Sequence, residues 1–535
     1  MRGADILIQS ISKSEINVIF SVSGNQIMPI FDAAIDSKIQ IVHCRHEASA
    51  VFMADGYAKT SGKTGIALVT AAPGFSNALG PLYAIKASQS PVVLLSGDSP
   101  LNQDGLKPFQ ELNQTKIAQE LVKKSWRVNN VENIGFDIAK AISISKTGRP
   151  GPVHLSLPFD ILNSNSMKAE VPSKSYFHPR VSKLNNHSKD FITQILKKYK
   201  NPLILTNSAL SESRHPNLIN DLSKFQIPII CISSPRGLND PAQGEIKSVV
   251  RQADLVFLID KEIDFTLGFG RENVFSANAF IVIADQIKTI KHAKKILGKK
   301  VILSAKADPK NVISFILSLK SLIIDKSWKS KVQKLVTSRP KEPKKKTTKI
   351  SPSELCKTVI KMVNLDKTFF IIDGGEFGQW AQANAPISKM FPNGLSGAIG
   401  GSVSQAIGAS FANPGSQILS FMGDGTAGFH PAEWETARRF NLPIIYIIGN
   451  DQRWGAEVEI QINDYGKKRA KFCYLDNITR YDKIAKAMGC EGFHVKSFNE
   501  LRQSMVKALK LKKTTVIDVE IEGFAAPSFH QPMTK

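Results

Sequence analysis

The stretch from Gly423 to Gly455 constrains the fold more than any other part of the chain. Ile418–Met422 is a short apolar run with strand character, and Gly423-Asp424-Gly425 ends it abruptly. A helical pattern that Pro431 can open comes next, and Ile444–Ile448 then has the composition of a buried strand. These elements predict a strand–helix–strand unit whose two strands are parallel neighbours.

An aspartate follows each of these predicted strands. Asp424 follows the first strand and Asp451 the second, with glycines close by. Parallel neighbours end at the same edge of a sheet, which is where open α/β sheets bind ligands. Carboxylate oxygens beside exposed backbone N–H groups suit Mg²⁺ that holds a diphosphate. Gly-Asp-Gly by itself is equally typical of a tight turn, so the predicted metal site depends on both aspartates.

The rest of the chain alternates helical and strand patterns. We therefore expect an α/β protein of three doubly wound parallel-sheet domains, covering residues 1–165, 186–335 and 351–535. The basic run 339–349 contains two prolines and no large apolar residue, which is typical of a linker. Pro91–Asp98 has the same pattern as Pro443–Asn450, which suggests that the first and last domains share a fold.

The composition narrows the possible partners. The chain has 535 residues and a net charge of +24, but its lysines are spread along the sequence, so we expect no nucleic-acid binding. No apolar run is long enough to span a membrane, and residues 1–20 lack the apolar core of a signal peptide. The five cysteines are scattered and odd in number, which predicts small buried thiols in a reducing cytoplasm.

Four sequence motifs together resemble those of the thiamine-diphosphate-dependent enzymes. They are Arg45-His46-Glu47-Ala48, the turn 72–77, Gly397–Ser402, and Gly423-Asp424-Gly425 paired with Asn450-Asp451. The motifs occur in the family's order along the whole chain. They resemble most the acetolactate synthase-like branch, with acetohydroxyacid synthase, oxalyl-CoA decarboxylase, benzaldehyde lyase and pyruvate decarboxylase. The aspartate at position 451 departs from the asparagine that is commoner there.

The resemblance implies a role for each domain and a mode of assembly. The first domain is expected to bind the pyrimidine of thiamine diphosphate and the last domain its diphosphate. The family's active site lies between the first domain of one subunit and the third of its partner, which implies a homodimer or homotetramer. The middle domain is expected to be structural. It lacks the features by which synthases hold FAD, so FAD is not expected.

The resemblance also implies the roles of individual residues. Glu47 is expected to hydrogen-bond the pyrimidine and thereby to help activate the thiazolium carbon. Ile399 is expected to bend the cofactor into its V shape. The expected Mg²⁺ ligands are Asp424, Asp451 and the backbone carbonyl of Arg453. The other expected cofactor contacts are Pro73, Asn77, Gly375, Glu376, Phe377, Gly397, Gly423, Gly425 and Thr426, together with the two aspartates.

The residues expected near the substrate give mixed signals about the reaction. Gln110 lies in a Phe-Gln-Glu segment that resembles that of acetohydroxyacid synthases. Glu457 lies where pyruvate decarboxylases have a proton-relay glutamate, although a solvated helix carboxylate explains it equally well. The expected substrate contacts are Asn25, Gln26, Phe75 and Trp454.

Three interpretations remain open. The first is a thiamine-diphosphate- and Mg²⁺-dependent carboligase that decarboxylates a 2-oxo acid to an enamine and adds it to a second carbonyl. The second is a 2-hydroxyacyl-CoA lyase, a benzaldehyde lyase-like enzyme or a non-oxidative 2-oxo acid decarboxylase. The third is a non-catalytic binding or assembly protein of the same fold, against which Glu47, Asp424 and Asp451 together argue.

Overall fold

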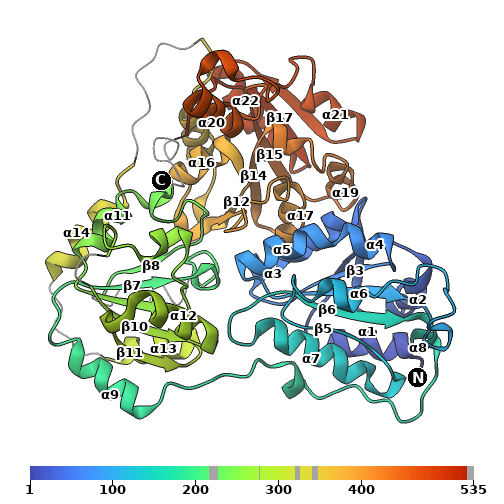
Figure 1. The fold of residues 1–535 in the computed structure, drawn as a ribbon. Helices are drawn as coiled ribbons and strands as arrows, with labels where there is room; N and C mark the ends of the chain where they lie inside the picture. The colour runs from blue at the N-terminus through green and yellow to red at the C-terminus, as the bar shows by residue number, and fades with distance from the viewer. Residues whose placement is uncertain (216–226, 276–277, 320–325, 340–347, 527–535) are drawn as a thin grey trace.

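Three parallel sheets, each formed by a separate part of the chain, organise the structure (Figure 1). The computed structural model describes residues 1–215, 227–275, 278–319, 326–339 and 348–526. Every strand pairing in the three sheets is parallel, so the predicted architecture of three α/β domains is confirmed. Within these residues no helix is both long enough and apolar enough to cross a membrane.

The N-terminal sheet has six strands in the order β2-β1-β3-β4-β6-β5. They are β1 (Val18–Ser21), β2 (Gln40–His43), β3 (Gly65–Val69), β4 (Val92–Asp98), β5 (Ser125–Arg127) and β6 (Val153–Pro158). One face is covered by α1 (Gly3–Lys13), α2 (Met28–Ile35) and α7 (Ile134–Lys146), and the other by α3 (Glu47–Ser61) and α5 (Leu79–Ser88). Because both faces are buried, most of these strands are continuous apolar runs in the sequence.

The C-terminal sheet repeats this connectivity, in the order β13-β12-β14-β15-β17-β16. Its strands are β12 (Thr368–Ile372), β13 (Met390–Pro392), β14 (Gln417–Gly423), β15 (Ile444–Asn450), β16 (Glu491–Val495) and β17 (Thr515–Glu520). One face carries α15 (Pro352–Lys361), α16 (Gly375–Asn384) and α22 (Phe498–Leu511), and the other α17 (Ser402–Ala412), α19 (Glu433–Arg439) and α21 (Tyr481–Ala487). The segments Pro91–Asp98 and Pro443–Asn450 contain the fourth strand of their sheets, which confirms the predicted repeat.

The middle sheet has five strands in the order β11-β10-β9-β7-β8. They are β7 (Pro202–Thr206), β8 (Ile229–Cys231), β9 (Leu255–Ile259), β10 (Ala279–Ala284) and β11 (Val301–Lys306). The sheet lies between α11 (Ile246–Gln252), α12 (Ile287–Leu297) and α14 (Lys326–Val336) on one face and α9 (Asn186–Ile195) and α13 (Pro309–Ser318) on the other.

Three details differ from the sequence predictions or lie outside the structure. The helix after β14 begins at Glu433 rather than Pro431, and the short helix α18 (Asp424–Ala427) precedes it. None of the five cysteines, all of which the structure describes, forms a disulfide, but Cys231 and Cys473 are only partly buried. Most of the predicted linker, residues 340–347, lies outside the described residues.

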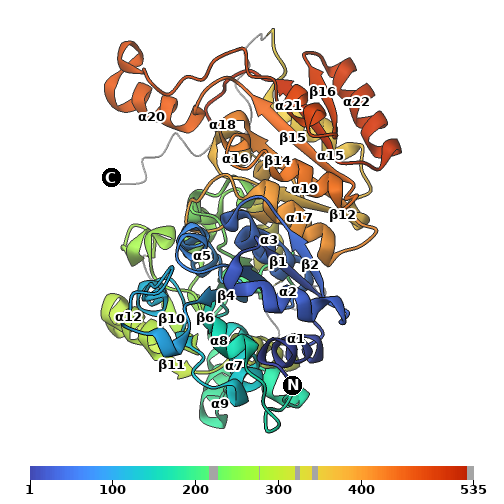
Figure 2. The same cartoon turned by 90° about the vertical axis from the view of Figure 1, so that its right-hand side faces the viewer.

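The first and last domains pack through two equivalent helices, α3 and α17, which lie side by side in both views (Figures 1 and 2). Glycines permit this close crossing. A Cβ added at Gly56 would overlap the carbonyl oxygen of Gln405, and one added at Gly408 would overlap that of Met53. Residues from both helices belong to one continuous apolar core, so the two domains share their interior.

Gly408→Val is therefore expected to lower the free energy of unfolding by about 3 kcal/mol or more, because backbone atoms of α3 cannot yield to the new side chain. Denaturant unfolding followed by circular dichroism measures this change. Gly80→Ala is the control, since Gly80 lies in α5 with open space around its Cβ position. Equal unfolding midpoints for the two variants would contradict the tight crossing.

Candidate active site

A cavity of about 150 Å³ opens where β14 and β15 end. The two strands pair in register up to Gly423 and Gly449, so Asp424 and Asp451 follow at one edge of the sheet. Both aspartates line the cavity, as the strand–helix–strand pattern predicted. The other predicted residues that line it are Gly375, Glu376, Phe377, Gly397, Ile399, Gly423, Gly425, Thr426, Arg453, Trp454 and Glu457. We call it the Asp424 cavity.

The two aspartates create a need for positive charge in this cavity. Asp424 is buried, and burial together with the nearby charge of Asp451 raises its pKa to about 8. Burial also raises the pKa of Asp451, although Arg453 opposes that shift. Two carboxylates in a desolvated site are stable as anions only beside a cation. Their oxygens are the ligand type that Mg²⁺ prefers, so the residues present fit such an ion.

Arg453 supplies part of that positive charge. Its guanidinium pairs with Asp451 Oδ2 at 2.6 Å, with Glu376 Oε2 at 3.1 Å and with Glu459 Oε1 at 3.0 Å. These carboxylates raise the pKa of Arg453 above its ordinary value, although burial opposes them. The sequence interpretation assigned only the backbone carbonyl of Arg453 to the metal. In the structure its side chain pairs with Asp451 and holds that carboxylate in place.

The N-terminus of α16 borders the cavity, because Gly375, the first residue of this helix, lines it. Gly375 has a φ of +83°. Its first N–H groups have no partner within the helix, which makes the end of a helix suitable for an anion. The carboxylate of Glu376 is already engaged: it accepts a hydrogen bond from the Ala526 N–H at 3.1 Å and pairs with Arg453. Burial raises its pKa to about 8. We therefore attribute anion binding here to the backbone rather than to the Glu376 side chain.

Asp373, which the sequence analysis did not single out, shapes the wall that carries Gly397 and Ile399. This fully buried carboxylate accepts hydrogen bonds from the N–H groups of Gly374 at 2.7 Å, Gly400 at 2.9 Å and Ser402 at 3.1 Å. It thereby fixes the turn before α17. Its only sequence signal is its place at the end of an apolar run, directly before two glycines.

A second cluster of predicted residues lies in the N-terminal domain. Glu47 is the first residue of α3, and its Oε2 accepts a hydrogen bond from Asn77 Nδ2 at 3.0 Å. Gln26, in the 3₁₀ turn η1 (Asn25–Ile27), donates to Gln110 Oε1 at 2.8 Å and accepts from Thr70 Oγ1 at 2.6 Å. The structure thus brings Glu47 to Asn77 and Gln26 to Gln110, and their roles toward cofactor and substrate stay predictions.

Three other predicted residues have different surroundings. Phe75 is fully buried against the ring of His154, 4.9 Å between centroids, so it belongs to the domain core and does not face a substrate. Pro73 and Asn25 are exposed on the N-terminal domain. The described residues that line the Asp424 cavity all come from the middle and C-terminal domains. Glu47, Asn77, Gln26 and Gln110, which we call the Glu47 cluster, therefore do not line the Asp424 cavity of the same chain.

Helix α19 of the C-terminal domain nevertheless contacts the turn that carries Glu47. The buried carboxylate of Glu433 accepts hydrogen bonds from the Arg45 N–H at 3.0 Å and from Thr436 Oγ1 at 2.7 Å. Arg45 also pairs with Glu435 at 3.0 Å through its side chain. Oγ of Ser49, the third residue of α3, is 3.2 Å from Nδ1 of His430, which lies just before α19. The position of Glu47 thus depends on a domain more than 380 residues away in sequence.

Comparison with known proteins agrees with this geometry. Residues 1–117 match the family profile described as thiamine pyrophosphate enzyme, N-terminal TPP binding domain, and residues 373–519 match the corresponding C-terminal TPP binding domain. The acetolactate synthase large subunit of Buchnera aphidicola (subsp. Schizaphis graminum) is 27% identical over 98% of this chain and 95% of its own length.

Two further relatives represent different activities and organisms. The catalytic subunit of mitochondrial acetolactate synthase from Saccharomyces cerevisiae is 26% identical over 98% of this chain and 81% of its own length. The 2-hydroxyacyl-CoA lyase 2 of Xenopus laevis is 26% identical over 91% of this chain and 84% of its own length. The chain belongs to the thiamine pyrophosphate enzymes. Within that family, it is an enzyme similar to acetolactate synthases over nearly its full length.

Glu433→Ala is expected to loosen the turn before Glu47, because the N–H of Arg45 loses its acceptor. Hydrogen–deuterium exchange of residues 43–48 measures this, and we expect the exchange rate to rise roughly tenfold or more. Glu435→Gln is the matched control, since it removes the ion pair with the Arg45 side chain and leaves the backbone contact in place. Equal exchange rates in the two variants would contradict the role of Glu433.

Proposed function

We propose that this protein is a thiamine-diphosphate- and Mg²⁺-dependent enzyme that breaks and forms carbon–carbon bonds on 2-oxo acids, as an acetolactate synthase does. The observation that carries the proposal is the buried pair Asp424 and Asp451 at adjoining strand ends, beside the N-terminus of α16. That arrangement suits a divalent cation bound to a diphosphate. The relatives named acetolactate synthase match nearly all of the chain, which favours this reaction class.

Each residue then has a defined task. Asp424 and Asp451 would hold the Mg²⁺, with the Arg453 carbonyl as a third ligand, and Ile399 would contact the cofactor. Glu47 hydrogen-bonds the pyrimidine and shifts its proton distribution. Bound thiamine diphosphate supplies the electron sink for breaking the bond next to a carbonyl. Gln110 and Gln26, already hydrogen-bonded to each other, orient the substrate. The proposal includes no FAD.

A second candidate function is a 2-hydroxyacyl-CoA lyase or a decarboxylase. The Xenopus relative supports the lyase. Glu457, an exposed carboxylate that lines the Asp424 cavity, supports the decarboxylase. A carboxylic acid at that position can protonate a carbanion, which favours decarboxylation over carboligation. A non-catalytic role is disfavoured, because both aspartates and Glu47 have the chemistry that turnover needs.

We propose that the active enzyme is a homodimer or homotetramer in the cytoplasm, with residues 1–165 as the pyrimidine-binding domain, 186–335 as the central domain and 351–535 as the diphosphate-binding domain. The Glu47 cluster and the Asp424 cavity do not meet within one chain, so a partner subunit is required to unite them. Several large apolar side chains are exposed and suit contact with a partner subunit: Phe109 (74%), Phe472 (99%) and Ile478 (80%).

Glu47→Gln is expected to abolish turnover while thiamine diphosphate still binds, because an amide keeps the shape of the side chain but not its acidity. The assay supplies pyruvate, thiamine diphosphate and Mg²⁺: acetolactate supports a synthase, and acetaldehyde supports a decarboxylase. Failure with pyruvate directs the assay to 2-hydroxyacyl-CoA thioesters. Glu15→Gln is the control, since Glu15 pairs with Lys174 at the surface. Near-normal turnover by Glu47→Gln would overturn the assignment.

The role of Asp451 is tested by two substitutions. Asp451→Ala removes the oxygen ligand, so the Mg²⁺ concentration for half-maximal cofactor binding is expected to rise roughly tenfold or more. Asp451→Asn keeps an oxygen and is expected to change that concentration by a smaller factor. Glu459→Gln, which affects Arg453 without approaching the metal, controls for the ion-pair network. Calorimetry with thiamine diphosphate at graded Mg²⁺ decides, and equal effects of the Ala and Asn variants would exclude Asp451 as a ligand.

A further inference from the structure

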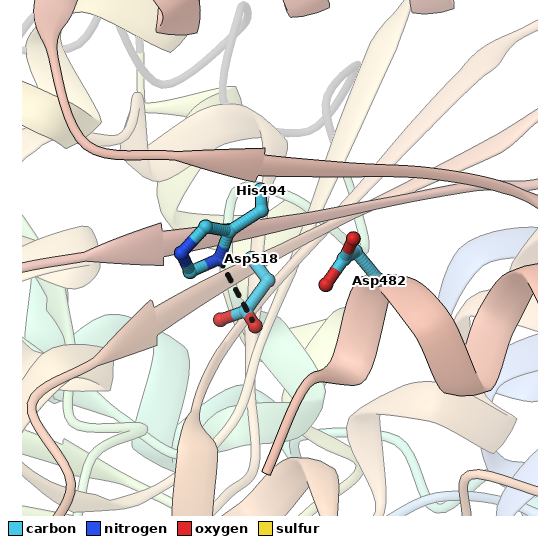
Figure 3. Close-up of side chains that lie close together, drawn as sticks. All are labelled: Asp482, His494 and Asp518. Carbon is cyan, nitrogen blue, oxygen red and sulfur yellow. Dashed lines mark ion pairs between the residues drawn. The ribbon is translucent and has the colours of Figure 1, made fainter. Parts of the chain in front are cut away.

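A second group of potential metal ligands lies outside the Asp424 cavity. Asp482 on α21, His494 on β16 and Asp518 on β17 converge, and their ligand atoms lie within 4.8 Å of one another (Figure 3). The side chains of Asp482 and Asp518 are 4% and 0% exposed, and that of His494 is 16% exposed. In the view of Figure 3, the imidazole and both carboxylates lie around a common point between the helix and the strands.

The histidine is oriented as a metal-binding histidine usually is. Its Nε2 is 2.9 Å from Glu520 Oε1, a distance at which a protonated Nε2 donates to that carboxylate. In the neutral ring this leaves the lone pair on Nδ1, which faces Asp518 Oδ2 at 3.7 Å. Nδ1 is buried and has no hydrogen-bond partner among the residues that the structure describes. A buried lone pair opposite a carboxylate is unfavourable unless a cation lies between them.

The two aspartates are held in position by other groups. Asp518 Oδ1 accepts a hydrogen bond from Asn450 Nδ2 at 3.0 Å, and its Oδ2 accepts one from the Tyr481 N–H at 3.3 Å. Asp482 accepts from Arg480 Nε at 2.8 Å and from Arg480 Nη2 at 3.1 Å. Each carboxylate oxygen has a further lone pair, so these hydrogen bonds orient the carboxylates and leave lone pairs free for a metal ion.

We propose that Asp482, His494 and Asp518 bind a divalent transition-metal ion, for which Zn²⁺ is the best match. One imidazole nitrogen and two carboxylate oxygens are a ligand set that zinc accepts, with water completing the coordination. Glu520 and Asn450 form the outer contacts that fix His494 and Asp518. The ion ties α21 to β16 and β17. This inference does not depend on the proposed function.

Two hydrogen bonds connect the site to the Asp424 cavity. Asn450, which donates to Asp518, immediately precedes Asp451. Tyr481, whose N–H donates to Asp518, also donates from its Oη to the Asp424 carbonyl at 2.6 Å. Arg480 places a positive charge beside Asp482 and so weakens metal binding. Removal of the Arg480 charge is therefore expected to strengthen metal binding, whereas removal of a ligand is expected to abolish it.

The test is calorimetric titration of Zn²⁺ into chelator-treated full-length protein in excess Mg²⁺, which occupies sites made of oxygen ligands alone. We expect one Zn²⁺ per chain. His494→Gln and Asp482→Asn are each expected to weaken binding by at least roughly tenfold, and Arg480→Gln to tighten it several-fold. Unfolding midpoints are measured in parallel: Zn²⁺ raises the midpoint of the wild-type protein and of Arg480→Gln, and not that of the two ligand variants.

Absence of stoichiometric Zn²⁺ binding to the wild-type chain would overturn the proposal. Retention of wild-type affinity by either ligand variant would also overturn it, because the partly buried thiols of Cys231 and Cys473 would then explain the binding. Circular dichroism of each variant shows whether it is folded before titration. If one ligand variant does not fold, the other decides alone.

Discussion

Two carboxylates forced together at the end of a sheet are the constraint on which the site depends. Parallel pairing of β14 and β15 puts Asp424 and Asp451 at the same edge, and burial makes their charges costly. The chain offsets part of this cost with Arg453, whose guanidinium contacts three carboxylates. In the function proposed above, a metal ion and a diphosphate at the N-terminus of α16 would complete the compensation, and their binding would then also stabilise the domain.

The second requirement is that the N-terminal domain holds Glu47 in a fixed place. The two outer sheets share one connectivity, and the equivalent helices α3 and α17 cross through glycines into a continuous core. Glu433 then secures the turn before Glu47 from the opposite domain. Packing of the two domains therefore sets the position of a residue that lies outside the Asp424 cavity. The proposed chemistry therefore depends on this domain interface as well as on the cavity.

The sequence contained most of the local information. Long apolar strands and glycine-rich turns predicted the sheets. The positions of Asp424 and Asp451 after two neighbouring strands predicted that both line one cavity. Three-residue strands such as β5 and β13 carry too little pattern to be recognised. The contacts of Glu433 with Arg45, of Asp373 with Gly400 and of Tyr481 with Asp424 join residues that are 388, 27 and 57 positions apart, so no local sequence pattern predicts them. Phe75 was expected to contact the substrate, yet its ring is fully buried in the core.

The central claim is that Glu47 of one subunit acts with Asp424 of another. Mixing two inactive variants, Glu47→Gln and Asp424→Asn, tests it most directly. In a hybrid dimer one of the two shared sites has both native residues, so random mixing is expected to restore about a quarter of the wild-type activity. If each active site belonged to a single chain, every site in the mixture would retain one defect. No recovery of activity after subunit exchange, verified by mass spectrometry of the hybrids, would contradict the shared site.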